Sequence, residues 1–230
     1  MAKAKTERIT VKTGTFRVSY PHVFVPQKNT MDPTAEAKYE LTMLFDAKDP
    51  FIETLKFAAK KAVAEKWGAD PSKWPTRQAK SDATGALLTN PDGTPKLVSA
   101  LKMPWRDGME KPDQPGYGAG IIFVKATSKM KPGVVSLEIG PDGKFAPIIQ
   151  PAEFYGGCYA HATINVYAYD TKGNKGVGVS LNNIQKLKDG EQFGGRSAPE
   201  DDFDAIKPGG AVAAGAPAAG AASTAPNPFE

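Results

Sequence analysis

Hydrophobic and polar residues alternate without a break from Cys158 to Tyr169. Side chains alternate between the two faces of a β-strand, so every second residue shares one face. The small apolar set is Cys158, Ala160, Ala162, Ile164, Val166 and Ala168; the polar set is Tyr159, His161, Thr163, Asn165, Tyr167 and Tyr169. We expect the apolar set to face a core. A Gly-containing turn and a second alternating run over residues 176–182 follow, which predicts a β-hairpin with one apolar and one polar face.

The same pattern predicts several further strands. They are expected over residues 8–12, 15–20, 38–45, 98–103, 119–127, 133–140 and 144–149. In the second of these, Phe16, Val18 and Tyr20 are expected to share one face, opposite Arg17 and Ser19. The chain is therefore predicted to be mainly β.

One main α-helix is predicted over about residues 50–67. Apolar residues recur there at helical spacing, Asp49 is suited to cap the helix, and Pro50 suits its first position. The segment 69–115, rich in Pro, Asp and Gly, is expected to form an irregular excursion that carries Trp74 and Trp105.

Charge is distributed unevenly along the chain. The net charge is +4 over 230 residues, but residues 199–230 contain five acids and one base, so residues 1–198 carry +8. A basic body favours a polyanionic partner, although such a charge can also simply keep a domain in solution. Residues 207–228 are almost entirely Ala, Gly, Pro and Ser, which predicts a flexible, disordered tail. We expect a folded domain over residues 1–198 and an acidic tail over residues 199–230.

The tail carries two aromatic residues that suggest a docking segment. An apolar ring on an acidic, flexible tether can bind a partner protein or occupy a basic groove of the body. The candidate docking residues are Asp201, Asp202, Phe203, Asp204 and Phe229. The alternative is a tail under no selection.

Composition argues against several functional classes. The chain has one cysteine, Cys158, no run of about 18 apolar residues, and no apolar segment near its start that is typical of a secretory signal. A reducing, cytoplasmic setting fits, with Cys158 as a core residue. No Ser–His–Asp, Cys–His or zinc-ligand pattern is present, so we expect no catalysis, no metal and no cofactor. The loop over residues 116–120 is Gly-rich, but a strand follows it, and a phosphate-binding loop of a nucleotide fold needs a helix there.

The three tyrosines on the polar face of the 158–169 strand suggest a surface on which bases stack. Each stacked base contributes roughly 1–3 kcal/mol in proteins that bind single strands. Tyrosine is also common on half-buried sheets, and another part of the chain can cover this face. The candidate stacking residues are Tyr159, Tyr167 and Tyr169, with His161 and Trp105 beside them. The candidate phosphate contacts are Arg17, Lys125, Lys172, Lys175 and Arg196.

Three motifs carry a resemblance to a known family. They are residues 156–169 (GGCYAHATINVYAY), residues 175–187 (KGVGVSLNNIQKL) and residues 193–196 (FGGR), preceded near the start by FRVSYP at residues 16–21. Together they resemble the bacteriophage single-stranded DNA-binding proteins formerly catalogued as a domain of unknown function. The resemblance covers roughly residues 5–205, and its last third is the most specific. It implies an OB-type β-barrel that coats single strands during phage DNA replication and recombination. The tail departs from the usual pattern, because its acids cluster about Phe203 rather than about the terminal Phe229.

The resulting hypothesis is a non-enzymatic protein that binds single-stranded DNA with little sequence preference in the host cytoplasm. Replication or recombination proteins would be further partners, reached through the tail. One alternative is a phage structural or protein-interaction module that uses the tyrosine face for protein contacts. The other is a nuclease, which would need a fixed cluster of carboxylates.

Overall fold

The computed structural model describes residues 8–28, 34–171 and 173–194. Strands dominate this part of the chain. They are β1 (Ile9–Lys12), β2 (Phe16–Gln27), β3 (Lys38–Asp46), β4 (Thr76–Gln78), β5 (Leu97–Ser99), β6 (Trp105–Asp107), β7 (Ile121–Ser128), β8 (Gly133–Ile139), β9 (Phe145–Pro147), β10 (Tyr159–Thr171) and β11 (Asn174–Lys188). The α-helix is α1 (Pro50–Trp67), and three short 3₁₀ turns are η1 (Pro71–Lys73), η2 (Gly108–Glu110) and η3 (Pro151–Glu153). The predicted mainly β fold with one main helix is confirmed.

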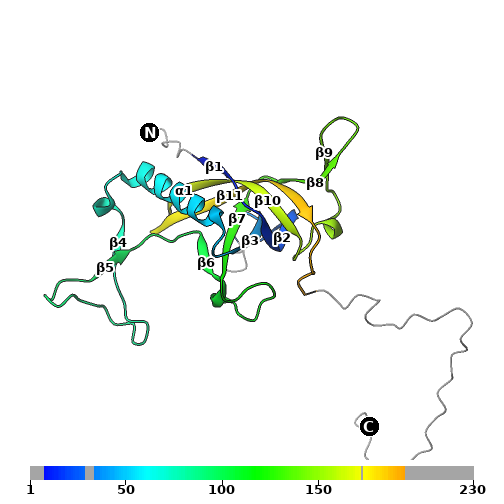
Figure 1. The fold of residues 1–230 in the computed structure, drawn as a ribbon. Coiled ribbons are helices and arrows are strands. Elements are labelled where there is room, and N and C mark those ends of the chain that lie inside the picture. Colours follow the sequence, from blue (N-terminus) through cyan, green and yellow to red (C-terminus); the bar gives the residue numbers. More distant parts are fainter. Residues whose placement is uncertain (1–7, 29–33, 172, 195–230) are drawn as a thin grey trace, which may run out of the picture. The chain divides into compact units, whose positions relative to one another are not determined.

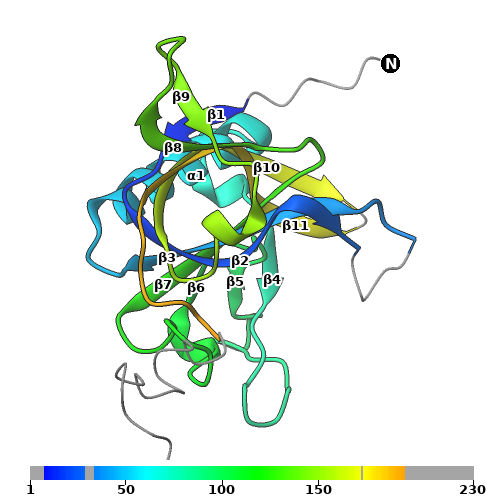
Figure 2. The same ribbon diagram turned by 90° about the vertical axis from the view of Figure 1, so that its right-hand side faces the viewer.

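Five of the strands pair in a closed circuit. β2 pairs with β3, β3 with β7, β7 with β11, β11 with β10, and β10 again with β2. All of these pairs are antiparallel except β7 with β11. Closing a sheet on itself leaves few unpaired edges. The ring-like sheet visible in Figure 2 is consistent with the OB-type fold that the resemblance implied.

The core lies on the apolar face of β10, where the alternation predicted it. Ala160, Ile164 and Val166 are completely buried, and α1 packs against this strand with Leu55, which is also fully buried. Cys158 is buried as well, and its burial raises the pKa of its thiol. The prediction that Cys158 is a core residue is confirmed.

The helix begins as the sequence predicted. Asp49 accepts a hydrogen bond of 2.8 Å from the backbone N–H of Phe51, and Pro50 occupies the first turn. Such a cap satisfies one of the backbone donors that a helix leaves unpaired at its start. The helix ends at Trp67, before Gly68, whose positive φ of 96° suits glycine.

One expectation about β2 is wrong. Phe16 and Val18 face the core, but Tyr20 does not: it is 42% exposed, and Val23 is the next buried residue after it. The register between β2 and β3 shifts between Ser19 and His22, so the strand contains a local irregularity there. An irregularity of this kind breaks the period of two on which the prediction depended.

Two appendages extend from the ring. The β4–β5 arm and the β8–β9 hairpin lie on opposite sides of the described fold in both ribbon views (Figures 1 and 2). After the arm, the chain runs beside β11. The backbone N–H of Lys102 donates to the carbonyl of Lys175, and the carbonyl of Lys102 accepts from the backbone N–H of Val177. Gly176 permits this approach, because a Cβ there would lie 2.3 Å from Lys102 O. No helix in the described part of the chain is long and apolar enough to cross a membrane.

Candidate functional site

The outward face of β2, β3 and β7 carries most of the candidate site. Residues directly opposite each other in an antiparallel pair point to the same side of the sheet. The register therefore aligns two rows of polar side chains across the three strands: Ser19, Thr42 and Lys125, and next to them His22, Glu40 and Thr127. Lys38, at the start of β3, extends this face toward the β2–β3 loop.

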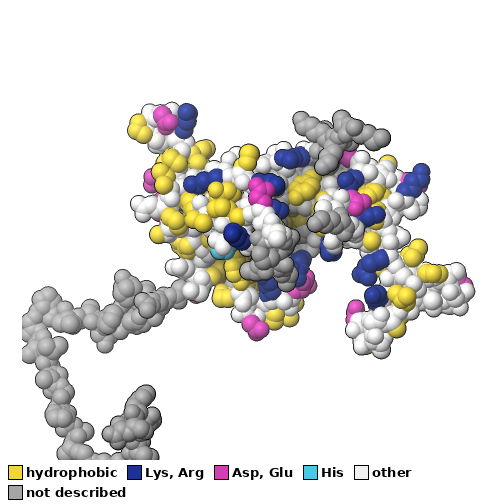
Figure 3. All heavy atoms as spheres, turned by 180° about the vertical axis from the view of Figure 1, so that it is seen from behind, with side chains coloured by type: hydrophobic (Ala, Val, Ile, Leu, Met, Phe, Trp, Pro, Cys, Tyr) yellow, Lys and Arg dark blue, Asp and Glu magenta, His cyan; other side chains and the backbone are white. Residues whose placement is uncertain are grey.

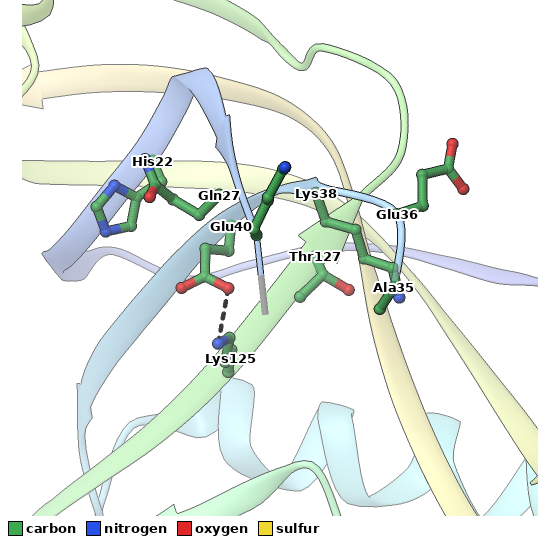
Figure 4. Close-up of a pocket in the computed structure, with 9 residues that line it drawn as sticks. His22, Gln27, Ala35, Glu36, Lys38, Glu40, Lys125 and Thr127 are labelled. Carbon is green, nitrogen blue, oxygen red and sulfur yellow. Dashed lines mark ion pairs between the residues drawn. The ribbon is translucent and has the colours of Figure 1, made fainter. Parts of the chain in front are cut away.

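A pocket of about 400 Å³ opens over the second row (Figure 4). Lys28, Lys38 and Lys125 line it together with Glu36 and Glu40. Lys125 Nζ lies 2.7 Å from a carboxylate oxygen of Glu40, and Figure 4 shows these two side chains pointing toward one another from neighbouring strands. Lys38 forms no salt bridge with a described residue, although its charge helps to lower the pKa of Glu36.

A second pocket, of about 590 Å³, adjoins the first. The two share Lys38 and Thr127 as lining residues. The second adds the cationic side chains Arg8, Lys129 and Lys131 and reaches Tyr167 on β10. Lys129 pairs with Glu36, whereas Arg8 and Lys131 form no salt bridge within the described ranges. Cations from three separate segments therefore line this pocket beside Tyr167 on β10.

A third pocket, of about 350 Å³, continues the row of pockets in the other direction. It shares His22 with the first pocket and is lined by the aromatic rings of Tyr20, Tyr117 and Phe193. Tyr117 packs edge-on against Phe123 with ring centres 5.3 Å apart, and burial raises the pKa of its phenol. We call the three adjoining pockets the outer groove. Figure 3, seen from behind the view of Figure 1, shows Lys and Arg side chains interspersed with hydrophobic ones over the body of the fold.

The polar face of β10 is only partly open. All six residues of the predicted polar set are half-buried. Tyr167 lines the outer groove, and its phenol has a raised pKa because of burial. Its ring lies against Gly178 on β11, where an added Cβ would come within 2.7 Å of the ring. His161 makes a hydrogen bond of 2.7 Å with Gln185, so its ring is tied to the neighbouring strand.

Tyr159 lies among cations at the opposite end of β10. The ammonium group of Lys188 is 4.6 Å and the guanidinium of Arg17 is 5.8 Å from the centre of its ring. Arg17 is itself engaged: it donates to the carbonyls of Gly157 (3.1 Å) and Glu191 (2.9 Å), and its guanidinium lies 4.3 Å from the centre of the Phe193 ring. These contacts position the segment after β11, and they leave Arg17 little freedom to bind a ligand.

The remaining predicted site residues fall into four groups. Lys125 is paired with Glu40, and Lys175 with Asp170 at 3.6 Å, although both lysines stay accessible. Trp105 is half-buried against the core, and its β-sheet partner is the fully buried Val124, so its ring does not face the outer groove. Seven predicted site residues lie outside the described residues: Lys172, Arg196, Asp201, Asp202, Phe203, Asp204 and Phe229. The predicted boundary between residues 198 and 199 lies outside them too. Tyr169 is half-buried near the β10–β11 turn.

Sequence reasoning missed most of the residues that line the outer groove. The missed residues are Arg8, Tyr20, His22, Lys28, Lys38, Lys129, Lys131, Tyr117 and Phe193. Lys129 and Lys131 could have been noticed, because two cations stand in the short turn between predicted strands. No local signal marks Tyr117, and Phe193 stood out only as the first residue of the FGGR motif. The positions of both rings depend on how distant segments pack. Within the described residues, no group of three or more His, Cys, Asp or Glu side chains is placed to hold a metal ion.

Comparisons with known proteins give a consistent result. Residues 9–212 match the model of a family described as "Enterobacter phage Enc34, ssDNA-binding protein". Putative protein p50 of Acyrthosiphon pisum secondary endosymbiont phage 1 is 29% identical over 196 residues, which cover 84% of this chain and 92% of that protein. The fold is similar to the single-stranded DNA-binding protein of bacteriophage Enc34 solved in complex with ssDNA (TM-score 0.52, 22% identity, 84% of this chain and 97% of that one). A C-terminal truncation of the Enc34 protein matches with TM-score 0.54 and 21% identity, over 84% of this chain and 95% of that one.

Proposed function

The chain belongs to the Enterobacter phage Enc34 single-stranded DNA-binding protein family, and on that premise we propose that it binds single-stranded DNA along the outer groove. We further propose that it does so with little sequence preference and without catalysing a reaction, during phage DNA replication or recombination in the host cytoplasm. The observation that carries this proposal is the continuity of the groove, which joins cationic and aromatic pockets across one face of the ring.

The location agrees with how OB folds are used in general. OB folds bind oligonucleotides on the face of their second and third strands, flanked by the loops after the first and fourth strands. In the ring described here those strands are β3 and β7, and those loops are the β2–β3 and β10–β11 connections. This location follows from fold analogy, and the side chains of the groove support it independently.

The groove is chemically suited to an unpaired strand. Six cationic side chains line its two larger pockets, against two carboxylates, Glu36 and Glu40. Such an excess attracts the phosphate chain, which every sequence shares. Flat rings at both ends, Tyr167 and Tyr117 among them, provide π-faces on which any base can stack. Cationic and aromatic groups of this kind favour binding that depends little on base identity.

A titration with poly-dT at two salt concentrations tests the proposal. Four of the six groove cations form no salt bridge with a described residue. With about four phosphates neutralised, the logarithm of the binding constant should fall with the logarithm of the salt concentration with a slope of about −3. A protein that binds poly-dT at neither salt concentration would contradict single-strand binding and would favour the protein-interaction alternative. Turnover of the strand with magnesium would contradict the non-enzymatic proposal.

We propose in addition that the acidic segment after residue 198 competes with DNA for the basic groove and docks replication or recombination proteins. Its five acids and single base, together with Phe203 and Phe229, support this proposal. A protein truncated before Pro199 is expected to bind poly-dT more tightly at low salt, by up to about tenfold, because a competing polyanion has been removed. The matched control replaces the five acids by their amides in the full-length chain. Equal or weaker binding by both variants would rule out competition.

A further inference from the structure

Tyr20 has an unusual backbone conformation. Its φ of 46° makes it the single non-glycine residue with positive φ in the described part of the chain. This left-handed region is uncommon for side chains other than Gly, Asn and Asp, and a bulky aromatic residue there is strained. Strain of this kind persists only where the surrounding structure imposes it, and it is concentrated at functional sites.

The conformation has a clear consequence for the side chain. An unbroken β2 would direct Tyr20 into the core beside Val18, whereas Tyr20 is 42% exposed. The phenol donates a hydrogen bond of 2.5 Å to the side-chain oxygen of Gln114, and the ammonium group of Lys111 lies 5.4 Å from the ring centre. The left-handed residue therefore turns a core-facing position into one wall of the outer groove.

The pocket beside Tyr20 has three aromatic walls from separate segments. Tyr117 is positioned by its edge-on contact with Phe123 and by the hydroxyl of Ser19, 3.2 Å from its phenol oxygen. Phe193 is positioned by Arg17 and by close packing against Gly116, where an added Cβ would lie 2.2 Å from the ring. The walls are thus fixed by packing before any ligand arrives, which lowers the entropy cost of binding.

The chemistry of this pocket fits one flat ring with polar edges. Pro21 and Pro115 extend the apolar lining, and the polar groups are few: Ser19, His22 and Gln114. His22 also lines the adjoining pocket with Lys28, Lys38 and Lys125, so a phosphate chain held there would pass the mouth of the aromatic pocket. A nucleobase attached to that phosphate chain fits both the apolar lining of this pocket and its position beside the cationic pocket.

We propose that this pocket takes one unstacked nucleobase of the bound strand, and that strained Tyr20 forms one of its three aromatic walls. The inference rests on the proposed function, because it assigns a subsite within the same groove. It predicts that fold stability and base binding oppose one another at residue 20. Replacing tyrosine with a residue that accepts positive φ removes the strain and the wall together.

The test compares Tyr20→Asn with Tyr20→Phe in the full chain. Asparagine tolerates the left-handed region, so Tyr20→Asn should melt at the wild-type temperature or above it. Its affinity for oligo-dT should fall roughly 5- to 150-fold, the range of one lost stacking contact. Tyr20→Phe keeps the ring and should bind oligo-dT nearly as tightly as the wild type. A matching abasic strand has the phosphates without the bases, and Tyr20→Asn should bind it as the wild type does.

The possible outcomes separate this inference from the proposed function. If the wild-type protein binds neither strand, the proposed function itself is wrong. Wild-type binding of oligo-dT by Tyr20→Asn, or an equal loss on the oligo-dT and abasic strands, would overturn the base pocket while leaving groove binding intact. A melting temperature clearly below that of the wild type would show that the contacts of Tyr20 with Gln114 and Lys111 outweigh the strain, and it would contradict the predicted opposition between stability and base binding.

Discussion

Reversing the charge of both Lys38 and Lys131 is expected to weaken binding of single-stranded DNA more than 100-fold at moderate salt. Both ammonium groups line the outer groove, and neither forms a salt bridge within the described residues. A hydrogen bond to a charged group contributes roughly 1.5–3 kcal/mol, so losing two such contacts costs about 3–6 kcal/mol. Each lost phosphate contact should also reduce the salt slope by about 0.7. The Lys38→Glu, Lys131→Glu variant should therefore have a slope smaller by about 1.4, measured by fluorescence titration with poly-dT.

A control with the same change in net charge distinguishes local contacts from long-range attraction. Lys56→Glu and Lys60→Glu on the exposed side of α1 alter the total charge equally, outside the groove. If the phosphate chain runs along the groove, the helix variant keeps most of the affinity and nearly the full salt slope. Equal losses in the two variants would show that only the overall charge matters, and the groove would lose its support as the binding site.

Tyr167→Ala is expected to weaken single-strand binding by about 1–3 kcal/mol, or about 5- to 150-fold. The half-buried ring lies at the edge of the cationic pocket with one side against Gly178, so its position is fixed before binding. A fixed ring can stack a base without losing rotamer freedom, which favours affinity. Tyr167→Phe keeps the stacking surface and should retain nearly all the affinity in the same titration. A wild-type affinity in Tyr167→Ala would exclude Tyr167 from the interface.

Gly178 offers a second way to examine this ring without removing it. A methyl group at position 178 would lie within 2.7 Å of the Tyr167 ring and must displace it. Gly178→Ala is therefore expected to lower affinity in the same direction as Tyr167→Ala, with the tyrosine still present. The double variant should bind no more weakly than Tyr167→Ala alone, since both changes remove one contact. Additive losses would mean that Gly178 acts on binding by another route.

The sequence predicted the orientation of some residues correctly and of others wrongly, and each outcome has a physical reason. The unbroken alternation of β10 placed Ala160 and Ile164 in the core and Tyr167 on the polar face, as observed. Along β2 the same reasoning was wrong at Tyr20, because a shift of register and a positive φ are not encoded in a period of two. Arg17 was assigned correctly to the polar face, but the sequence did not reveal that the carbonyls of Gly157 and Glu191 occupy its guanidinium.

The sequence by itself determined the mainly β class, the single capped helix at Pro50–Trp67 and the inward and outward faces of β10. These features follow from local periodicity and capping, which operate within one strand or one turn. Only the tertiary structure decided which cations lie beside Tyr167. Arg8, Lys38 and Lys131 come from distant segments and meet because β3, β7, β10 and β11 belong to one closed ring. Closure depends on pairing between strands far apart along the chain, and no local pattern records which strand lies across from which.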